Sequence, residues 1–424
     1  MKILHLSTDD FSGGASRAAY RLHTALLDNG IDSNLRVLFH QTANDKVVAG
    51  KGPRTVIEKV KARLLKKLYE YSEKKFKTDN LILHSFGQVS AGVVNEINNS
   101  DADVVNLHWV SNFLSIEDIG NLKKPIVWTL HDMWAFCGGE HYVNDQDAPR
   151  FKMGYLSDNR PASESGPDLN RQAWESKKKY WANQRFNIVT PGHWMAQCAK
   201  ESVLLNDATI TVVPNPLELE HLWRPIPKDF ARRVLGLDQD KKYVLSGSAG
   251  GSPNIKGEDL LESAMKKVAE SDSDSIELLV FGKYQPAGYV ESLYKTHWLG
   301  PVRDDSVMRL IYSAADVMVV PSRQDNLPNT AVEAHACGTP VVAFNIGGLP
   351  DIVEQKQSGW LAPAFDTDNL AEGVLWVLSS QSRWDQLSTT ARKIAQERFS
   401  TKAVTEQYMR VYENALLKYR GNHG

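Results

Sequence analysis

The sequence predicts an α/β protein with two doubly wound domains, each built on a parallel sheet. At 424 residues the chain is too long for one ordinary hydrophobic core. Short apolar runs without alternation, such as Val317 to Val320, are typical of strands buried on both faces of a parallel sheet. The proline-rich segment from Pro214 to Pro227 separates two such series of strands and marks a hinge.

Composition and charge place the chain among globular proteins. The hydrophobic share is 42%, the charged share is 24%, and a net charge of -2 gives no general attraction to nucleic acid. The three cysteines, Cys137, Cys198 and Cys337, are scattered singly, so they predict neither a disulfide framework nor a zinc cluster. A reduced cytosolic compartment fits best. The first seven residues are too few and too polar for a signal peptide, and no apolar run is long enough to span a bilayer.

The first predicted strand, Lys2 to Ser7, and the first predicted helix, Ala15 to Leu27, are joined by a loop that contains Gly13 and Gly14. Only backbone without a Cβ can approach a ligand closely at such a turn, so these glycines could line a cleft. A tight-turn role alone explains them equally well. The loop lacks the GxGxxG pattern, which counts against a dinucleotide-binding oxidoreductase.

Residues 51 to 77 predict a basic amphipathic helix. The range holds ten Lys or Arg against three Glu, and one helical stripe carries Ile57, Val60, Leu64, Leu68 and Tyr71. Most such helices pack the stripe on their own domain and leave the charges in water. Contact with an anionic membrane is the second interpretation.

Two further predicted strands are Asp103 to Leu107 and Ile126 to Leu130, and the second delivers His131 and Asp132 to its carboxyl end. A single histidine at such a place is more often structural than catalytic. The polar segment from Met133 to Asn170 predicts a long loop, and loops of this length are usually functional lids or disordered.

The predicted first domain closes with strands at Phe186 to Thr190 and Thr209 to Val213, and the alternation restarts at Tyr243 to Ser246. A glycine-rich loop follows and ends in Lys256 and Gly257, where we expect a helix to start. A lysine at a helix start opposes the helix dipole, and an anionic ligand would explain it. A solvated surface lysine is the alternative.

The stretch from Asp316 to Gly348 predicts a complete βαβ unit. Its loop lies at the carboxyl end of a strand and enters a helix N-terminus, where phosphates are favoured. Thr330 and Glu333 have capping-box spacing, so Glu333 could be an ordinary capping acid and Asp325 an ordinary turn residue. The remaining predicted elements are strands at Glu277 to Phe281, Trp298 to Gly300 and Val341 to Phe344, and helices at Asp366 to Ser379 and Ser400 to Tyr419.

The string PSRQDNLPNTAVEAHACGTPVVAFNIGGLPDIV resembles the nucleotide-sugar signature of family 4 glycosyltransferases. In that family two acids with seven residues between them bracket a glycine-rich loop. The resemblance implies that Glu333 holds the ribose hydroxyls of the donor and that Asp325 lies beside the donor sugar. The first acid is usually Glu, and Asn326, Leu327 and Pro328 replace the usual Gly-Phe-Gly.

The resemblance also implies roles elsewhere in the chain. His131 matches the active-site histidine of the family, the Gly13-Gly14 loop would face the donor phosphates and the acceptor, and Lys256 would bind the donor diphosphate. An arginine that usually precedes this lysine is missing, so backbone amides or Arg323 must share the phosphate charge. The implied catalytic residues are His131, Lys256 and Asp325. The implied donor-binding residues are Gly13, Gly14, Lys256, Arg323, Asp325, Asn326, Leu327, Pro328, Asn329, Thr330 and Glu333.

The resemblance covers nearly the whole chain and implies the GT-B architecture, two Rossmann-like domains facing across a cleft. We expect residues 1–216 to form the acceptor-side domain and residues 217–400 the donor domain, with a helix at 401–424 returning to the first domain. The implied activity is retaining, hexosyltransferase-type transfer from a UDP or GDP sugar to a polysaccharide, lipopolysaccharide or lipid-linked acceptor. Such an enzyme would be cytoplasmic, at the inner face of the plasma membrane.

No cofactor or metal is expected. A hard cation needs carboxylates where a strand meets the phosphates. Asp-x-Asp pairs that lie instead in turns, in the long loop or before strands are Asp101-Ala102-Asp103, Asp145-Gln146-Asp147, Asp238-Gln239-Asp240 and Asp272-Ser273-Asp274. Related polysaccharide enzymes often carry cysteines in the long loop, but this chain has only Cys137 there. Two alternatives remain: a nucleotide-sugar epimerase of the same architecture, and a catalytically silent subunit that binds a sugar nucleotide.

Overall fold

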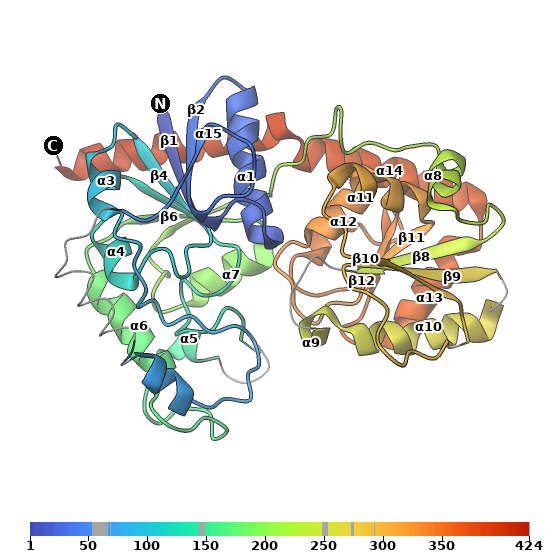
Figure 1. The fold of residues 1–424 in the computed structure, drawn as a ribbon, viewed down its shortest axis with the longest axis horizontal. Coiled ribbons are helices and arrows are strands. Elements are labelled where there is room, and N and C mark those ends of the chain that lie inside the picture. Colours follow the sequence, from blue (N-terminus) through green and yellow to red (C-terminus); the bar gives the residue numbers. More distant parts are fainter. Residues whose placement is uncertain are drawn as a thin grey trace. The chain divides into compact units, whose positions relative to one another are not determined.

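The computed structural model describes residues 1–52, 67, 69–143, 149–247, 253–272, 275–291 and 293–423. The chain divides into two compact units, one made of Met1–Val213 with Thr405–Gly424 and the other of Pro214–Val404. Each unit is a parallel sheet with helices packed against it (Figure 1). Both units are therefore Rossmann-like, as the sequence predicts.

The first unit contains a seven-stranded parallel sheet in the order β3-β2-β1-β4-β5-β6-β7. The order reverses between β1 and β4, and ligands of open α/β sheets bind at such a switch point, outside the carboxyl ends of the strands. The strands are β1 (Lys2–Asp9), β2 (Asp32–Phe39), β3 (Val47–Ala49), β4 (Val104–Leu107), β5 (Ile126–Thr129), β6 (Phe186–Thr190) and β7 (Thr209–Val212).

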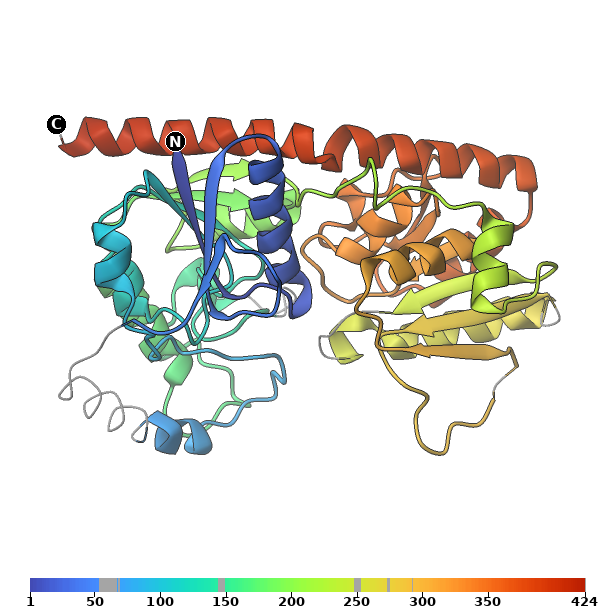
Figure 2. The same ribbon diagram turned by 45° about the horizontal axis from the view of Figure 1, so that its top comes forward.

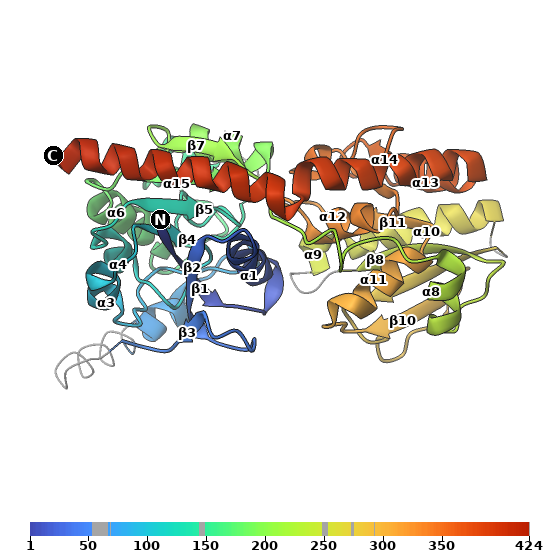
Figure 3. The same cartoon turned by 90° about the horizontal axis from the view of Figure 1, so that it is seen from above.

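Some helices of the first unit pack directly on this sheet. The helix α1 (Gly13–Asp28) does so through the stripe that contains Ala18, Leu22 and Leu26. The others are α3 (Val94–Asn99), α4 (Ile116–Gly120), α5 (Arg150–Met153), α6 (Leu169–Tyr180) and α7 (His193–Glu201). The last helix, α15 (Thr401–His423), runs across the strands of this sheet, as Figure 3 shows from above. Its Tyr412 and Tyr408 hydroxyls bond to Asn106 of β4 and Thr129 of β5.

The second unit contains a six-stranded parallel sheet in the order β10-β9-β8-β11-β12-β13. Here the order reverses between β8 and β11, which defines a second switch point. The strands are β8 (Lys242–Gly247), β9 (Ile276–Phe281), β10 (Thr296–Gly300), β11 (Val317–Val320), β12 (Val341–Phe344) and β13 (Gly359–Ala362).

Both faces of the second sheet are buried. Successive side chains of a strand point to opposite faces, so neighbouring residues of one strand belong to different core clusters. Tyr243 and Leu245 of β8 join one core cluster, and Val244 between them joins another. Figure 2 shows helices on both sides of this sheet. They are α8 (Lys228–Leu235), α9 (Pro253–Lys256), α10 (Glu258–Asp272), α11 (Asp305–Ala314), α12 (Asn329–Ala336), α13 (Thr367–Leu378) and α14 (Gln381–Phe399), with a 3₁₀ turn η1 at Leu349–Asp351.

Every strand predicted from the sequence is present in the structure, within about two residues at each end. Three strands were not predicted: β2, β3 and β13. The strand β2 has alternating burial rather than a continuous apolar run, and the other two lie at sheet edges. Among the described residues, no helix is long and apolar enough to cross a membrane.

Two expectations need correction. The segment 133–170 is a long loop in its described part apart from α5, as predicted, but it is packed rather than disordered, and Met133, Phe136 and Cys137 are fully buried. The predicted basic helix lies largely outside the described residues. Its described end, residues 69–75, is helical, as predicted, but Tyr71, the member of the predicted stripe that the structure describes, is 61% exposed and does not pack on the domain.

Candidate functional site

The loop from Pro321 to Pro328 connects β11 to α12 and holds Asp325 at the switch point of the second sheet. The ammonium of Lys256 lies 2.7 Å from Oδ2 of Asp325, and the hydroxyl of Ser322 lies 3.4 Å from the same oxygen. Because β8 and β11 are neighbours, the loops that follow them meet at one edge of the sheet. The structure therefore brings together two of the three predicted catalytic residues.

Gly257 allows this meeting. Its φ is +68°, and a Cβ at this position would lie 1.9 Å from the carbonyl oxygen of Pro321. The amide of Arg323 also donates to the carbonyl of Ile255 over 2.7 Å. The backbone at 255–257 is thus fixed against the end of β11, and this fixes Lys256 beside Asp325. Lys256 ends the short helix α9, and the expected helix, α10, starts two residues later at Glu258. Lys256 therefore lies between the end of one helix and the start of the next.

Gly347 and Gly348 support the loop from the other side. Added Cβ atoms would lie 2.1 Å from the carbonyl oxygen of Asp325 and 1.7 Å from that of Asn326. The amide of Gly348 donates to the carbonyl of Asp325 over 3.1 Å. These glycines belong to the matched string, but the sequence alone gave them no role. They are required because backbone packs on backbone here.

Glu333 is not a capping residue, so the capping-box expectation is wrong. The N-cap of α12 is Pro328, and no side chain caps this helix. Glu333 lies one turn into α12, is only 6% exposed, and accepts a hydrogen bond from the hydroxyl of Tyr312 over 2.9 Å. Tyr312 comes from α11 and was missed by sequence reasoning, because nothing in the spacing of the two residues indicates that the helices are neighbours.

Arg323 makes a bidentate ion pair with Asp259, at 2.7 and 2.6 Å, and also donates to the carbonyl of Asn254. The pair raises the pKa of Arg323 and lowers that of Asp259. Asp259 follows Lys256 by three residues, and the backbone of Arg323 bonds to that of Ile255, the residue before Lys256. The cation predicted to share the phosphate charge is therefore near the site but is already partly neutralised.

The remaining predicted donor residues follow directly in the chain. Asn326, Leu327 and Pro328 are buried, whereas Asn329 and Thr330, the first residues of α12, are partly exposed. Asn329 also accepts from the side-chain amide of Asn215 over 3.3 Å. All of the predicted residues of the second unit thus gather at the carboxyl ends of β8 and β11.

In the first unit, His131 lies two residues after the end of β5. Its Nε2 lies 3.0 Å from Nδ1 of His108, and the two rings stack with centroids 5.3 Å apart. Burial lowers the pKa of His131 to about 4. The imidazole is therefore neutral near pH 7.

The predicted glycines lie at the start of α1. Gly13 has a φ of +84°, and no atom lies within 4 Å of the place where its Cβ would be. The preceding loop is held by Asp9, whose Oδ1 accepts from the amides of Phe11 and Ser12 at 2.7 and 2.6 Å. The space beside Gly13 is open, which fits either a close approach of a ligand or the turn itself.

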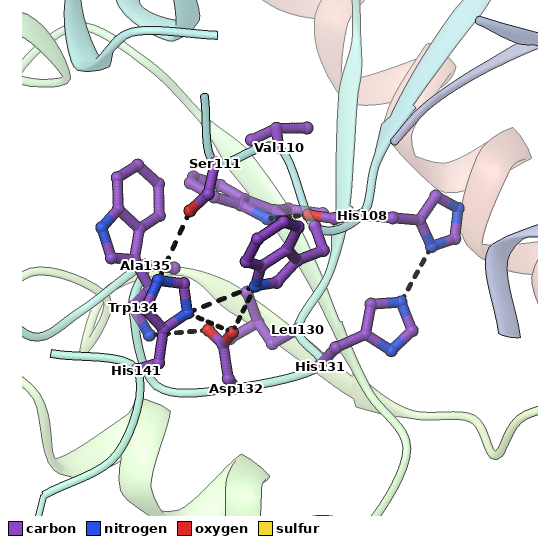
Figure 4. Close-up of a pocket in the computed structure, with 11 residues that line it drawn as sticks. His108, Val110, Ser111, Leu130, His131, Asp132, Trp134, Ala135 and His141 are labelled. Atoms are coloured by element: carbon purple, nitrogen blue, oxygen red, sulfur yellow. Dashed lines mark hydrogen bonds and ion pairs between the residues drawn. The ribbon is translucent and has the colours of Figure 1, made fainter. Parts of the chain in front are cut away.

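A polar network surrounds the residue after His131 (Figure 4). Asp132 accepts from the indole of Trp109 at 2.9 Å and bonds to Nδ1 of His141 at 2.6 Å, while Nε2 of His141 lies 2.8 Å from the hydroxyl of Ser85. Burial raises the pKa of Asp132, but His141 outweighs it, and the net shift is downward. The network borders a cavity of about 10 Å³, close to the space that one water molecule needs. The cavity is too small to hold a sugar.

Lys177 of α6 organises the chain between Asp132 and His141. Its ammonium is fully buried and donates to the carbonyls of Trp134, Cys137 and Gly138. It also lies 4.0 Å from the centroid of the Trp134 ring. Sequence reasoning missed Lys177, because a lysine in a polar amphipathic helix ordinarily points into water.

Metal-ligand clusters are absent from the described part of the chain: no group of three His, Cys, Asp or Glu residues there could hold an ion. Residues 144–148 and 248–252, which include one Asp-x-Asp pair, lie outside that part.

Residues 241–380 match the protein-family model described as "Glycosyl transferases group 1". An uncharacterized glycosyltransferase of Methanocaldococcus jannaschii is 32% identical over 324 residues, which is 74% of this chain and 76% of that protein. A D-inositol 3-phosphate glycosyltransferase of Saccharomonospora viridis is 33% identical over 230 residues, and here the match spans about half of either protein, 51% of this chain and 52% of the relative.

Solved structures share the fold over almost the full chain. Sucrose-phosphate synthase from Thermosynechococcus elongatus has a TM-score of 0.66 and 17% identity, with 99% of this chain and 100% of that chain covered. Anabaena HepE in complex with UDP-glucose has a TM-score of 0.62 and 15% identity, with 98% and 100% covered. These likenesses establish the GT-B architecture.

Proposed function

Because this chain belongs to the group 1 glycosyltransferases, we propose that it is a retaining, metal-independent family 4 enzyme that transfers a sugar from a nucleoside diphosphate sugar to a glycan or lipid-linked acceptor. The observation that carries this proposal is the contact between Lys256 and Asp325 at the switch point of the second sheet. At this place a cation is suited to the diphosphate of such a donor, and an acid is suited to the hydroxyls of its sugar.

Lys256 would bind the diphosphate and stabilise it as the leaving group. Negative charge on the diphosphate grows as the glycosidic bond breaks, and a preorganised ammonium stabilises that charge. A lysine ammonium has three donor hydrogens, so Lys256 can bond to Asp325 and to a phosphate oxygen at the same time. Asp325 would then hold the ammonium in place and accept hydrogen bonds from hydroxyls of the donor sugar.

Glu333 would bind the ribose hydroxyls. A carboxylate has two oxygens and about four acceptor positions, and the Tyr312 hydroxyl donates to one of these oxygens. Backbone amides at the start of α12, together with Arg323, would share the phosphate charge. In the first unit, the family resemblance implies that His131 and the backbone at Gly13 and Gly14 also act on the donor or the acceptor.

A UDP or GDP sugar is the proposed donor, and UDP has the stronger support because HepE of Anabaena is known with bound UDP and UDP-glucose. For the acceptor, we propose a polysaccharide, lipopolysaccharide or lipid-linked glycan of the cell envelope. The structural neighbour WaaG, which is involved in lipopolysaccharide biosynthesis, supports this choice. A cytoplasmic enzyme at the inner face of the plasma membrane would have access to such acceptors.

A second acceptor class is favoured by a specific observation. Several relatives are D-inositol 3-phosphate glycosyltransferases, among them one from Catenulispora acidiphila that is 32% identical over 350 residues. A small phosphorylated polyol is therefore the alternative to a glycan. Transfer to inositol phosphate, with none to a lipid-linked glycan, would favour this alternative.

The donor can be identified by a thermal-shift screen of UDP, GDP and ADP sugars, because a ligand that binds the native state raises its apparent stability by mass action. The selected donor is then incubated with and without acceptors. An epimerised sugar in the absence of any acceptor would indicate the epimerase alternative. Nucleotide binding without turnover across the acceptor panel would indicate a silent subunit.

The metal-free mechanism has a direct test. If Lys256 and backbone amides stabilise the leaving diphosphate, turnover should survive exhaustive treatment with EDTA. Activity that disappears with EDTA and returns with Mg²⁺ or Mn²⁺ would contradict this part of the proposal. The anomeric configuration of the product, measured by NMR, tests retention separately.

A further inference from the structure

Three histidines from three different strands form a hydrogen-bonded row in the first unit. His5 lies in β1, His108 directly follows β4, and His131 lies two residues after the end of β5. Nδ1 of His5 lies 3.0 Å from Nε2 of His108, and Nδ1 of His108 lies 3.0 Å from Nε2 of His131. The rings also stack in sequence, with centroids 5.3 Å apart at both steps. The row crosses the switch point of the first sheet, between β1 and β4.

All three imidazoles are neutral at working pH. His5 and His108 are 0% and 3% exposed, and burial holds the pKa of both well below the usual value. Burial also lowers the pKa of His131 to about 4. A neutral imidazole has one N–H donor and one bare nitrogen acceptor. His108, the middle ring, must therefore donate to one neighbour and accept from the other.

This restriction leaves two arrangements for the whole row. If the hydrogen bonds point toward His131, its Nε2 accepts from His108 and its Nδ1 carries the hydrogen. If they point toward His5, the Nδ1 of His131 is bare and the Nε2 of His5 carries a hydrogen. The tautomers of the three rings are coupled, because each N–H···N bond fixes the tautomer of the next ring.

The buried end of the row distinguishes the two arrangements. Nε2 of His5 is buried and has no hydrogen-bond partner among the described residues. The neighbouring ring of His23 lies 6.1 Å away between centroids and bonds through Nδ1 to Ser33 instead. A buried N–H without an acceptor is rarer in folded proteins than a buried acceptor without a donor. The arrangement that leaves a bare nitrogen at His5 is therefore favoured.

We infer that His5 and His108 are positioning residues that hold His131 in the tautomer with hydrogen on Nδ1, so that His131 donates a hydrogen bond to an oxygen of the bound sugar. In Figure 4 the second ring nitrogen of His131 points away from His108. This inference rests on the proposed glycosyltransferase function. A hydrogen-bond donor of fixed direction recognises a hydroxyl oxygen of the sugar and does not remove its proton.

Asparagine and glutamine at position 108 provide a matched pair of variants. An asparagine amide reaches the place of histidine Nδ1, and a glutamine amide reaches the place of Nε2. His108→Asn therefore keeps a donor for His131, whereas His108→Gln keeps only the contact with His5. We expect His108→Asn to retain kcat/KM within about threefold and His108→Gln to lose roughly tenfold, the equivalent of one hydrogen bond. Both variants should melt at similar temperatures, because both remove the same ring.

Equal losses of kcat/KM in the two variants would mean that His108 acts only through packing and would overturn the inference. A second measurement does not depend on activity: ¹⁵N NMR of histidine-labelled protein, with His131 assigned from a His131→Asn variant. The expected result is a protonated Nδ1 and a bare Nε2 in the unmodified protein. A protonated Nε2 would overturn the inference even if glycosyl transfer is confirmed. Failure of the proposed function would instead appear as absent turnover with the NMR result unchanged.

Discussion

Lys256 and Glu333 are expected to act at different stages of the reaction. A charge-assisted hydrogen bond from either residue contributes roughly 1.5 to 3 kcal/mol, or about 10- to 150-fold in binding. The diphosphate gains charge in the transition state, whereas the ribose contact stays nearly constant. Lys256→Ala should therefore lower both kcat and donor affinity, and Glu333→Gln should mainly raise the donor KM. Steady-state kinetics with varied donor concentration measures both effects.

Tyr312→Phe is the matched control for Glu333→Gln. It removes the hydroxyl that bonds to Glu333 but leaves the carboxylate in place. We expect this variant to bind donor within about threefold of the parent, because a single neutral hydrogen bond is involved. Glu333 is buried, so its substitution can also affect stability. If Glu333→Gln melts well below the parent and yet binds donor normally, Glu333 is a structural residue.

Individual site residues could be named from the sequence where they directly follow an apolar strand. This applies to His131 and Asp325, which lie in loops at a strand's carboxyl end, and to Lys256, which ends the short helix that follows β8. The sequence did not predict which of the site residues contact one another. The contact between Lys256 and Asp325 depends on β8 and β11 being neighbours, and the pairing of Arg323 with Asp259 depends on the same packing. Such contacts arise from strand order, which residue spacing does not encode.

At the scale of elements, the segment between β5 and α6 depends on Lys177. Burial lowers the pKa of Lys177 to about 7, while an unfolded lysine titrates near the ordinary value of about 10.4. Between these values the unfolded chain binds a proton that the native chain does not, so the free energy of unfolding rises with pH. The slope is about 1.4 kcal/mol per pH unit for this group.

Urea unfolding of the parent and of Lys177→Met should reveal this slope. We expect the parent to gain stability relative to the variant between about pH 7 and about pH 9. Lys178→Met, which alters an exposed lysine of the same helix, is the control and should show no such trend. A difference that shrinks as pH rises would mean that the native state keeps Lys177 protonated, held by its three carbonyl acceptors.

Elements were predicted well where the apolar signal is continuous, as in β5, β8, β11 and β12. The missed strand β2 shows the limit. Its side chains alternate between buried and exposed, but Ser33 is a buried position and Arg36 a partly exposed one. The alternation of apolar and polar residues in the sequence is therefore imperfect, because a polar residue, Ser33, is buried, and the expected apolar run is absent. The segment that follows Met133 is a long loop, as predicted, but its burial was missed, because the burial depends on Lys177 and on aromatic residues that are far apart in the sequence.

For the whole molecule, membrane contact remains a prediction from charge. The basic residues of 51–77 would each contribute on the order of 1 kcal/mol near an anionic surface, and salt would screen them. We expect sedimentation with anionic but not with neutral liposomes at low ionic strength. The double substitution Lys74→Glu and Lys75→Glu should weaken binding to anionic liposomes at least about tenfold. The control, Lys178→Glu and Lys179→Glu, changes two lysines that are also exposed and should have little effect. Equal sedimentation with both kinds of liposome would exclude an electrostatic contact.

The chain returns to its first unit through α15, and this return can be tested with two tyrosines. Tyr412 accepts a hydrogen bond from the side-chain amide of Asn106 over 2.8 Å, and the Tyr408 hydroxyl lies 3.2 Å from that of Thr129. All four residues are buried. Thr129 also donates to Oδ1 of Asn106 over 3.1 Å, so its hydroxyl keeps a partner when Tyr408 is changed.

Removing the same hydroxyl from the two tyrosines should therefore have different costs. Tyr412→Phe leaves a buried N–H of Asn106 without its acceptor and should reduce the free energy of unfolding by about 1 to 3 kcal/mol. Tyr408→Phe leaves no such orphan and should cost less than about 1 kcal/mol. Urea unfolding followed by tryptophan fluorescence measures both, and equal costs would contradict the assignment. A chain that ends at Ser400 loses both tyrosines from this core, and we expect its first unit to fail to fold.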